Sequence, residues 1–452
     1  MHVDSALAIA RASIEARTIR KVRMRIIPFH FLLYIVAYLD RINIGFAALT
    51  MNKELGITSQ QFGLLVGVFF FGYFLFEIPS NLLLHKIGAR IWITRILISW
   101  GIIAALTGVV HSVAQLYFAR FLLGVMEAGF FPGIVLYLTY WFRQGKQAET
   151  IALFMSALPI TSIVGAPLSG LILDHVHCLG VSSWRWLLIL QGLPAVACGV
   201  LTYFLLPSRP TEANFLTREE KDWITAALSR EEDEKRTRNQ ISAMGILGDA
   251  RVWHLAAIGF TMANGLYAMS FWMPQLVRSF SRVYSNTVVG FLVMIPHLVG
   301  LVAMLLVSGS SDRNGDRRYH ITVPAFTGGM ALLLLGRTNS PFVSVALLSL
   351  LAVGIYSFYG PFFSLPSQFL TGFSAASGIA LINSVANLGG FVGPYAIGAI
   401  NVRTGSLYGG LAAVGLSLFF SAALVLVLPP ERPQFATLKP PPAPETHTDL
   451  TD

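Results

Sequence analysis

The sequence predicts an all-α membrane protein with twelve transmembrane helices in two pseudo-symmetric six-helix bundles. Of its 452 residues, 54% are hydrophobic and only 12% are charged, whereas soluble domains carry about 25% charged residues. The mean hydropathy is +0.64. Apolar stretches of about 20 residues, the length that crosses a bilayer, recur along the whole chain. Two landmarks of the first half also return in the second half at a single offset.

The predicted helices divide the chain into five regions. Residues 1–25 form a basic N-terminus, 26–206 the first bundle, 207–250 a charged linker, 251–428 the second bundle and 429–452 a disordered tail. The spans fall near 26–50, 61–84, 91–110, 114–141, 149–173, 184–206, 252–277, 287–310, 320–337, 341–369, 375–401 and 406–428.

The repeat is carried by a loop and by a proline. Gly88 and Gly315 lie in short basic loops after the second and eighth spans, and they are 227 positions apart. Pro167 in the fifth span and Pro394 in the eleventh have the same separation. The second half therefore copies the first in the same orientation, and repeats of this kind place a substrate site between the halves near the midplane.

Lysine and arginine set the expected orientation. With the N-terminus inside, the inner segments are rich in these residues and the outer loops are poor in them, so both termini should be cytoplasmic. The net charge of +9 follows this topology and does not indicate nucleic acid. The inner set, outside the linker, is Arg11, Arg17, Arg20, Lys21, Arg23, Arg25, Lys86, Arg90, Arg143, Lys146, Arg313, Arg317 and Arg318; the outer set is Lys53, Arg185, Arg278, Arg282, Arg337 and Arg403.

The first span contains an adjacent acid and base, Asp40 and Arg41. A charge at the centre of a membrane helix costs about 2.5–3.5 kcal/mol even on the lenient insertion scale, so the pair must face protein or water. Tyr34, Tyr38 and Arg41 share one helical face, and Asp40 lies about 100° around from it. Arginine keeps its charge and grips a carboxylate with two parallel hydrogen bonds, which suits an anion site.

Other spans bring polar residues toward the same level. In the fourth span Arg120 and Glu127 share a face, and the second span offers Tyr73 and Glu77. Glu77 precedes Pro79, so a structural place near water at the helix end is the favoured interpretation. Burial raises the pKa of a carboxylic acid and a nearby arginine lowers it, so acids beside Arg41 have the properties that proton coupling needs.

The second half offers amides and phenols. Asn383 and Asn387 share one face of the eleventh span, and Tyr359 recurs at helical spacing in the tenth. For Tyr359, packing in the core and lining the cavity are equally favoured interpretations. The same two interpretations apply to Asn264 and Tyr267 in the seventh span. An alternative to a role in coupling is that Asp40–Arg120 or Glu127–Arg41 is a purely structural ion pair that ties the first span to the fourth. His30 and His297 are expected to be packing residues.

These motifs resemble the major facilitator superfamily, and within it the anion:cation symporter family of bacterial tartrate, phthalate and galactonate carriers and animal sialin. Asn81 and His85 depart from the usual loop signature, which carries glycine and aspartate there. The matching stretches are Asp40-Arg41-Ile42-Asn43, Glu77-Ile78-Pro79-Ser80-Asn81, Arg120-Phe121-Leu122-Leu123-Gly124-Val125-Met126-Glu127-Ala128-Gly129 and Leu381-Ile382-Asn383-Ser384-Val385-Ala386-Asn387-Leu388-Gly389-Gly390.

The resemblance implies proton-coupled uptake of an organic anion across the bacterial inner membrane, with a tartrate-like or sugar-derived hydroxy acid favoured. It implies that Arg41 binds the substrate carboxylate, that Asp40 and Glu127 serve proton coupling, and that Tyr38, Tyr73 and Asn387 line the cavity. The helical faces add three residues to this set. Arg120 joins the proton-coupling acids, and Asn383 and Tyr359 join the substrate-binding residues. The expected partners are the anion and the lipid bilayer, with a monomer as the working unit.

Other functions fit less well. An enzyme would need a catalytic set, and the sequence has no metal cluster, nucleophile elbow or phosphate-binding loop. Cys178 and Cys198 have no metal-site spacing, so no metal and no cofactor besides the proton is expected. A drug exporter shares the fold, but Arg41 would repel its usual cationic cargo. An aromatic acid permease is a further alternative.

Overall fold

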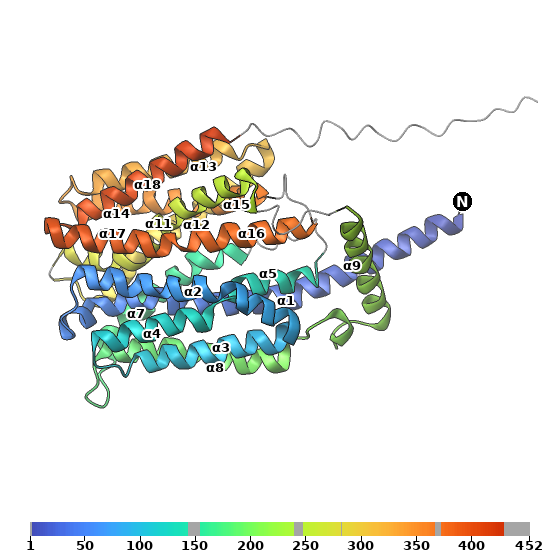
Figure 1. Ribbon diagram of the computed structural model, residues 1–452, viewed down its shortest axis with the longest axis horizontal. Helices are drawn as coiled ribbons and strands as arrows, with labels where there is room; N and C mark the ends of the chain where they lie inside the picture. The colour runs from blue at the N-terminus through green and yellow to red at the C-terminus, as the bar shows by residue number, and fades with distance from the viewer. Residues whose placement is uncertain (1, 143–153, 239–246, 282, 367–371, 429–452) are drawn as a thin grey trace, which may run out of the picture.

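The computed structural model describes residues 2–142, 154–238, 247–281, 283–366 and 372–428, and this part of the chain is helical without strands (Figure 1). Side chains are described from residue 13 onward, except those of residues 85, 231–238 and 372–377. Arg143, Lys146, Arg282 and the predicted tail 429–452 lie outside the described residues, as does the start of the predicted span 149–173.

Helices α1 to α8 form the first half, shown in blue to green in Figure 1, and helices α11 to α18 form the second half. The first set is α1 His2–Glu54, α2 Ser59–Ile87, α3 Ala89–Thr107, α4 Val113–Glu127, α5 Phe130–Thr139, α7 Ala157–His175 and α8 Ser183–Leu205. The second set is α11 Ala250–Ser279, α12 Asn286–Asn314, α13 Arg318–Leu335, α14 Pro341–Tyr356, α15 Tyr359–Ser364, α16 Gly372–Asn387, α17 Gly389–Thr404 and α18 Leu407–Val427.

Ten of the described helical stretches are long and apolar enough to cross a membrane. Helices α11 and α13 occupy two further predicted spans and complete twelve. Three predicted spans are interrupted, the fourth between α4 and α5, the tenth between α14 and α15 and the eleventh between α16 and α17. The fourth breaks at Gly129, whose φ of 83° is left-handed, just before Pro132, which has no amide hydrogen to continue the helix.

The repeated loops use glycine for one physical reason. Gly88 ends α2 with φ of 95°, and Gly315 ends α12 with φ of 68°. Residues with a side chain are strained in this region of φ, so glycine is required where each helix must turn sharply into the next. Both loops therefore use a glycine with positive φ, although ψ differs, being 150° at Gly88 and 7° at Gly315.

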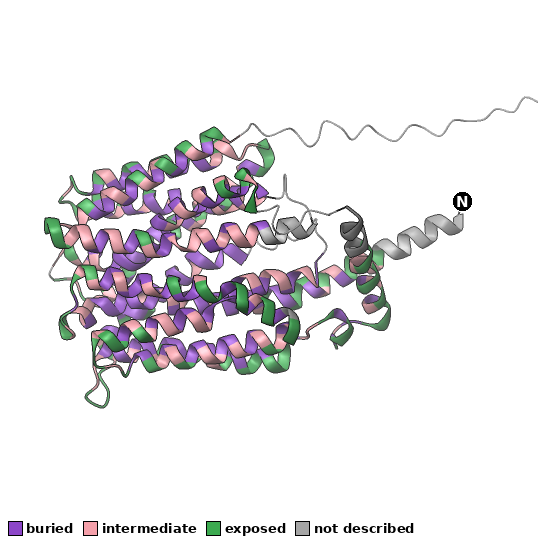
Figure 2. Cartoon of the chain, viewed as in Figure 1, coloured by how far each residue is buried: buried purple, intermediate pink, exposed green. Residues whose placement is uncertain are grey.

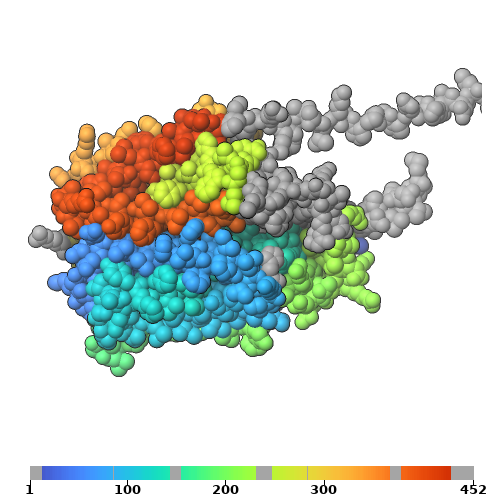
Figure 3. Space-filling view, in the orientation of Figure 1, coloured from blue at the N-terminus to red at the C-terminus, as the bar shows by residue number. Residues whose placement is uncertain are grey.

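The two halves pack face to face, with the first half below and the second half above in Figure 3. Helix α2 packs against α17, and α7 packs against α12. Glycines permit this close approach. A Cβ atom on Gly63 would lie 2.6 Å from the Pro394 carbonyl oxygen, and one on Gly290 would lie 2.5 Å from the Ala166 carbonyl oxygen. The buried residues in Figure 2 concentrate where the helices face one another.

An aspartate also joins the halves at the end of the bundle away from α9. The Asp174 carboxylate on α7 accepts hydrogen bonds from the Asn286 backbone amide (3.2 Å), the Asn286 side chain (2.8 Å) and the Thr287 backbone amide (2.7 Å). These are the first amides of α12, which have no partner within their own helix. Asp174 therefore caps a helix of the opposite half.

The predicted linker contains a short 3-10 helix, η1 Pro210–Glu212, and a longer helix, α9 Arg218–Arg238, at the right of Figure 1. Glu220 fixes α9 to α1 because its carboxylate accepts hydrogen bonds from Arg17 and Lys21, both at 2.9 Å. Loss of water contacts acts to raise the pKa of Glu220, but the bonds from the Thr217 amide, Lys21 and Arg17 outweigh it and lower the pKa. The linker is thus docked through a buried acid.

Candidate substrate-binding site

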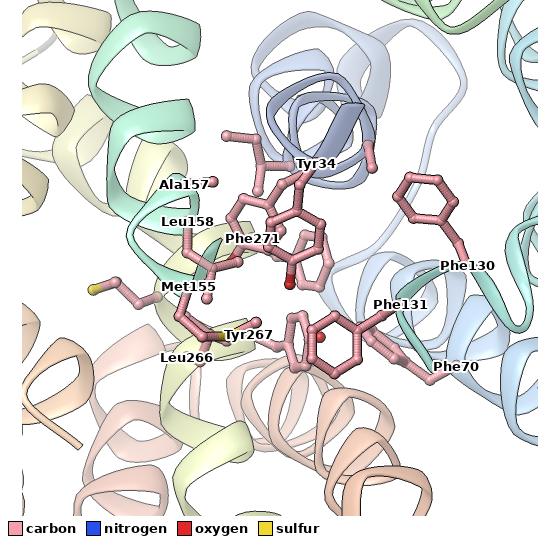
Figure 4. Packing of buried hydrophobic residues seen from close by; sticks show 14 of the residues in the cluster. Tyr34, Phe70, Phe130, Phe131, Met155, Ala157, Leu158, Leu266, Tyr267 and Phe271 are labelled. Carbon is pink, nitrogen blue, oxygen red and sulfur yellow. The ribbon is translucent and has the colours of Figure 1, made fainter. Parts of the chain in front are cut away.

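A cavity lies between the two halves, on the α9 side of Arg41. Helix α1 contributes Tyr34 and Arg41, and α2 contributes Tyr73. The second half contributes four polar residues, which are Tyr267, Tyr359, Asn383 and Asn387. Aromatic and aliphatic residues fill the rest of the wall, and Figure 4 shows Tyr34, Phe131, Met155, Leu158 and Tyr267 around this space.

The predicted substrate residues are placed as follows. Arg41, Tyr73, Tyr359, Asn383 and Asn387 line the cavity. Tyr38 does not. It is 1% exposed, and its hydroxyl shares a 3.1 Å hydrogen bond with the Ser270 hydroxyl. Tyr38 therefore connects α1 to α11 behind the cavity wall.

Arg41 is the charged group of the cavity wall. Its Nη2 donates to Glu127 on α4, and its Nη1 donates to the Tyr267 hydroxyl at 3.1 Å. The guanidinium also lies over the ring of Phe69, 5.3 Å from the centroid, and near that of Tyr73 at 5.6 Å. The side chain is 11% exposed, and Glu127 and Tyr267 take only two of the five N–H donors of the guanidinium. Donor capacity thus remains for a ligand.

Of the two candidate ion pairs, the structure forms Glu127–Arg41 and not Asp40–Arg120. Glu127 pairs with Arg41. Among the described residues no ion pair within 4.0 Å joins Asp40 to Arg120. Asp40 accepts hydrogen bonds of 3.0 Å from Asn43 and from the Trp100 indole. Arg120 lies over the Phe69 ring at 5.4 Å, and its Nε and Nη2 have no partner.

Glu77 is more deeply buried than expected. The expected place near water is wrong, because α2 continues through Pro79 to Ile87 and leaves Glu77 only 1% exposed. Its Oε2 accepts from the Ser384 hydroxyl at 2.6 Å, and its Oε1 accepts from Asn383 Nδ2 at 3.2 Å. Glu77 therefore connects α2 of the first half to α16 of the second.

A continuous polar chain crosses the interface between the halves. It runs from Glu127 through Arg41 and the Tyr267 hydroxyl to the Asn387 side-chain oxygen, the last bond being 3.3 Å. The sequence leaves Tyr267 open between core packing and cavity lining, and it does not indicate a role at the site for Trp100 or Ser384. Their partners lie on other helices, so no local pattern marks them.

The two buried histidines bond to their own helices. His30 Nδ1 lies 2.9 Å from the Ile26 carbonyl, and His297 Nδ1 lies 2.8 Å from the Val293 carbonyl. His30 also stacks on Tyr137 with the ring centroids 4.8 Å apart. Both are packing residues, as expected.

Two repeated helical bundles with a polar cavity between them are the arrangement found in many membrane transporters. The family model described as Major Facilitator Superfamily matches residues 31–394. The chain belongs to the Major Facilitator Superfamily. It is a multi-pass membrane transporter and not an enzyme, and the fold that the resemblance implied is confirmed.

Relatives cover almost the whole chain. A protein of Agrobacterium vitis named "Putative tartrate transporter" is 44% identical over 421 residues, which are 93% of this chain and 93% of the relative. The "Quinolone resistance transporter" of Acinetobacter baumannii is 38% identical, covering 92% of this chain and 95% of that protein. The solved E. coli xylose transporter XylE, in a partially occluded inward open conformation, superposes with a TM-score of 0.72 at 13% identity, covering 90% of this chain and 98% of that one, and supports the fold alone.

Proposed function

We propose that the protein takes up a small organic anion, a tartrate-like or sugar-derived hydroxy carboxylate, together with protons and by alternating access. The observation that carries the proposal is Arg41, a guanidinium with N–H donors left over at the wall of a cavity between the halves. A permanent cation in a region of low dielectric attracts a carboxylate strongly and repels a cation. Relatives named for tartrate transport support this substrate class.

The proton-coupling part of the proposal starts from the Arg41–Glu127 pair. A substrate carboxylate that binds Arg41 competes with Glu127 for the same guanidinium. Glu127 is 1% exposed, and a buried carboxylate without a cation is costly, so a proton on Glu127 removes that cost. Asp40 and Arg120 lie behind this pair and complete the proposed coupling group.

The proposed location is the bacterial inner membrane with both termini in the cytoplasm, as the distribution of lysine and arginine indicates. A monomer is the proposed working unit, with the organic anion and the surrounding lipid as its partners.

Uptake into proteoliposomes under an inward proton gradient tests the proposal. We expect Arg41→Ala and Arg41→Lys to abolish uptake of tartrate, because neither residue offers the planar two-point contact. The exposed Arg403→Ala is the control and should transport normally. Robust uptake by Arg41→Ala would exclude the anion site. Uptake driven by sodium at constant pH would show that the coupling ion is not the proton.

Export of an aromatic carboxylic acid is the second candidate. It is favoured by the relative named for quinolone resistance and by the phenylalanines of the cavity wall, Phe131, Phe358, Phe362 and Phe363. Quinolones carry a carboxylate, so Arg41 would suit them as well. Thermal-shift measurements with aliphatic hydroxy acids and quinolones separate the candidates, since the main proposal expects stabilisation by the hydroxy acids.

A further inference from the structure

Two asparagines on the cavity wall belong to one face of α16. Asn383 and Asn387 are four residues apart, both are partly exposed, and both line the cavity. Asn383 is held by Glu77, which lies outside the cavity wall, and Asn387 is held by the Tyr267 hydroxyl, which is itself bonded to Arg41. We infer that these two amides recognise a hydroxyl group of the substrate, with Asn383 accepting and Asn387 donating. The inference rests on the proposed function and specifies which organic anions the site prefers.

Glu77 fixes the orientation of Asn383. The NH₂ group of Asn383 donates to Glu77 Oε1 at 3.2 Å, and a carboxylate is an acceptor in this contact. The Ser384 hydroxyl bonds the other carboxylate oxygen at 2.6 Å. With the NH₂ group directed to Glu77, the amide oxygen of Asn383 remains for a ligand in the cavity.

Arg41 fixes the opposite orientation of Asn387. A guanidinium can only donate, so the Tyr267 hydroxyl accepts from Arg41 Nη1 at 3.1 Å. The hydroxyl of Tyr267 donates its proton to the amide oxygen of Asn387, 3.3 Å away. With that oxygen directed to Tyr267, the NH₂ group of Asn387 remains for a ligand in the cavity.

A hydroxyl is the simplest ligand group that satisfies such a pair, because it accepts one hydrogen bond and donates another. A methylene group does neither and would leave both amides unpaired. A site built to hydrogen-bond a hydroxyl rejects the analogue that lacks it. Since Tyr267 joins Arg41 to Asn387, the recognised hydroxyl lies close to the carboxylate held by Arg41.

Glu77 is therefore a positioning residue for substrate specificity. Glutamine has nearly the same size and shape, but it can donate as well as accept. In Glu77→Gln the Asn383 amide is no longer restricted to one orientation. The amide oxygen of Asn383 then faces the cavity for only part of the time, although Arg41 and the rest of the cavity wall are unchanged.

The experiment measures binding of tartrate, malate and succinate to the purified full-length protein, because these diacids share a four-carbon skeleton and carry two, one and no hydroxyl groups. We expect the wild type to bind tartrate at least about tenfold more tightly than succinate. Glu77→Gln and Asn383→Leu should weaken tartrate binding by about tenfold and leave succinate binding unchanged. Ser384→Ala is the matched control, because it removes a Glu77 bond without freeing Asn383, and it should keep the preference.

Asn387→Leu tests the other amide without touching Glu77 and supplies a second variant if Glu77→Gln does not fold. It should also reduce the ratio of tartrate to succinate affinity. Equal wild-type affinities for tartrate and succinate, both lost in Arg41→Ala, would overturn the inference and leave the anion site standing. An unchanged ratio in Glu77→Gln and Asn387→Leu would overturn it as well. Binding of none of the three acids would overturn the proposed function and this inference with it.

Discussion

At the residue scale, the two buried acids of the proposed coupling group have different surroundings. Glu127 contacts a cation, Arg41, which also faces the cavity. Asp40 accepts hydrogen bonds from Asn43 and Trp100, and neither of these residues lines the cavity. A bound anion can therefore reach the partner of Glu127 directly, whereas it can affect Asp40 only through the intervening side chains.

Glu127→Gln should separate exchange from accumulation. Glutamine keeps a hydrogen-bond acceptor for Arg41 but cannot bind and release a proton. We expect exchange of substrate across proteoliposomes to persist and accumulation under an inward proton gradient to be lost. Glu212→Gln, an exposed acid of η1, is the control. Unchanged pH-driven accumulation in Glu127→Gln would exclude Glu127 from coupling.

The sequence predicted much of this site at the residue scale. Five of the six predicted substrate residues line the cavity, because helical spacing shows which side chains share a face. Helical spacing does not show which helix lies opposite. For that reason Tyr38 could not be told from a cavity residue, and neither the depth of Glu77 nor the partners Trp100 and Ser384 could be found.

At the element scale, the contact between α7 and α12 closes the end of the interface remote from α9. Asp174→Ala should leave the Asn286 and Thr287 amides without their acceptor and weaken this closure by about 1 kcal/mol, the usual value of a capping hydrogen bond. We expect faster hydrogen exchange at the Asn286 and Thr287 amides. Asp249→Ala, which uncaps α11 within one half, should leave those two amides unchanged.

Helix α9 offers a pH test outside the membrane. Because the folded-state pKa of Glu220 is lowered, its contribution is present above the unfolded pKa of about 4.3 and is lost as the pH falls through the folded value. We expect amides of α9 to lose protection from hydrogen exchange below about pH 4. In Glu220→Gln protection should be weak already at pH 7. Equal protection of the two proteins at pH 7 would contradict this role.

The helix breaks show where prediction at the element scale stopped. The sequence predicted a single span over 114–141 and another over 375–401, but Gly129 and Leu388 divide them. Hydropathy averages over about 19 residues and cannot detect a change at one residue. The repeated loop glycines were found, since their local sequence alone marks the turn.

At the scale of the whole molecule, transport by rocking requires the halves to separate and rejoin. Gly290→Leu should prevent close packing of α12 on α7, because its Cβ atom would lie 2.5 Å from the Ala166 carbonyl oxygen. We expect low uptake from a folded protein, with spin labels at the α7 and α12 ends farther apart. Gly309→Leu on the same helix meets nothing within 4 Å and is the control. Normal uptake by Gly290→Leu would show that this contact is dispensable.

The two halves share a helical fold and repeated sequence landmarks, but the charges of the first half are not repeated in the second. The ionisable groups of the site, Asp40, Arg41, Glu77, Arg120 and Glu127, all belong to the first half. The polar groups that meet them from the second half, Tyr267, Asn383, Ser384 and Asn387, are neutral. Moving one elementary charge across 100 mV changes the free energy by about 2.3 kcal/mol. When the second half moves around the site, the polar groups that it brings to the site carry no charge. We therefore expect the membrane voltage to act on the binding of the anion and the protons, and not on the movement of these groups.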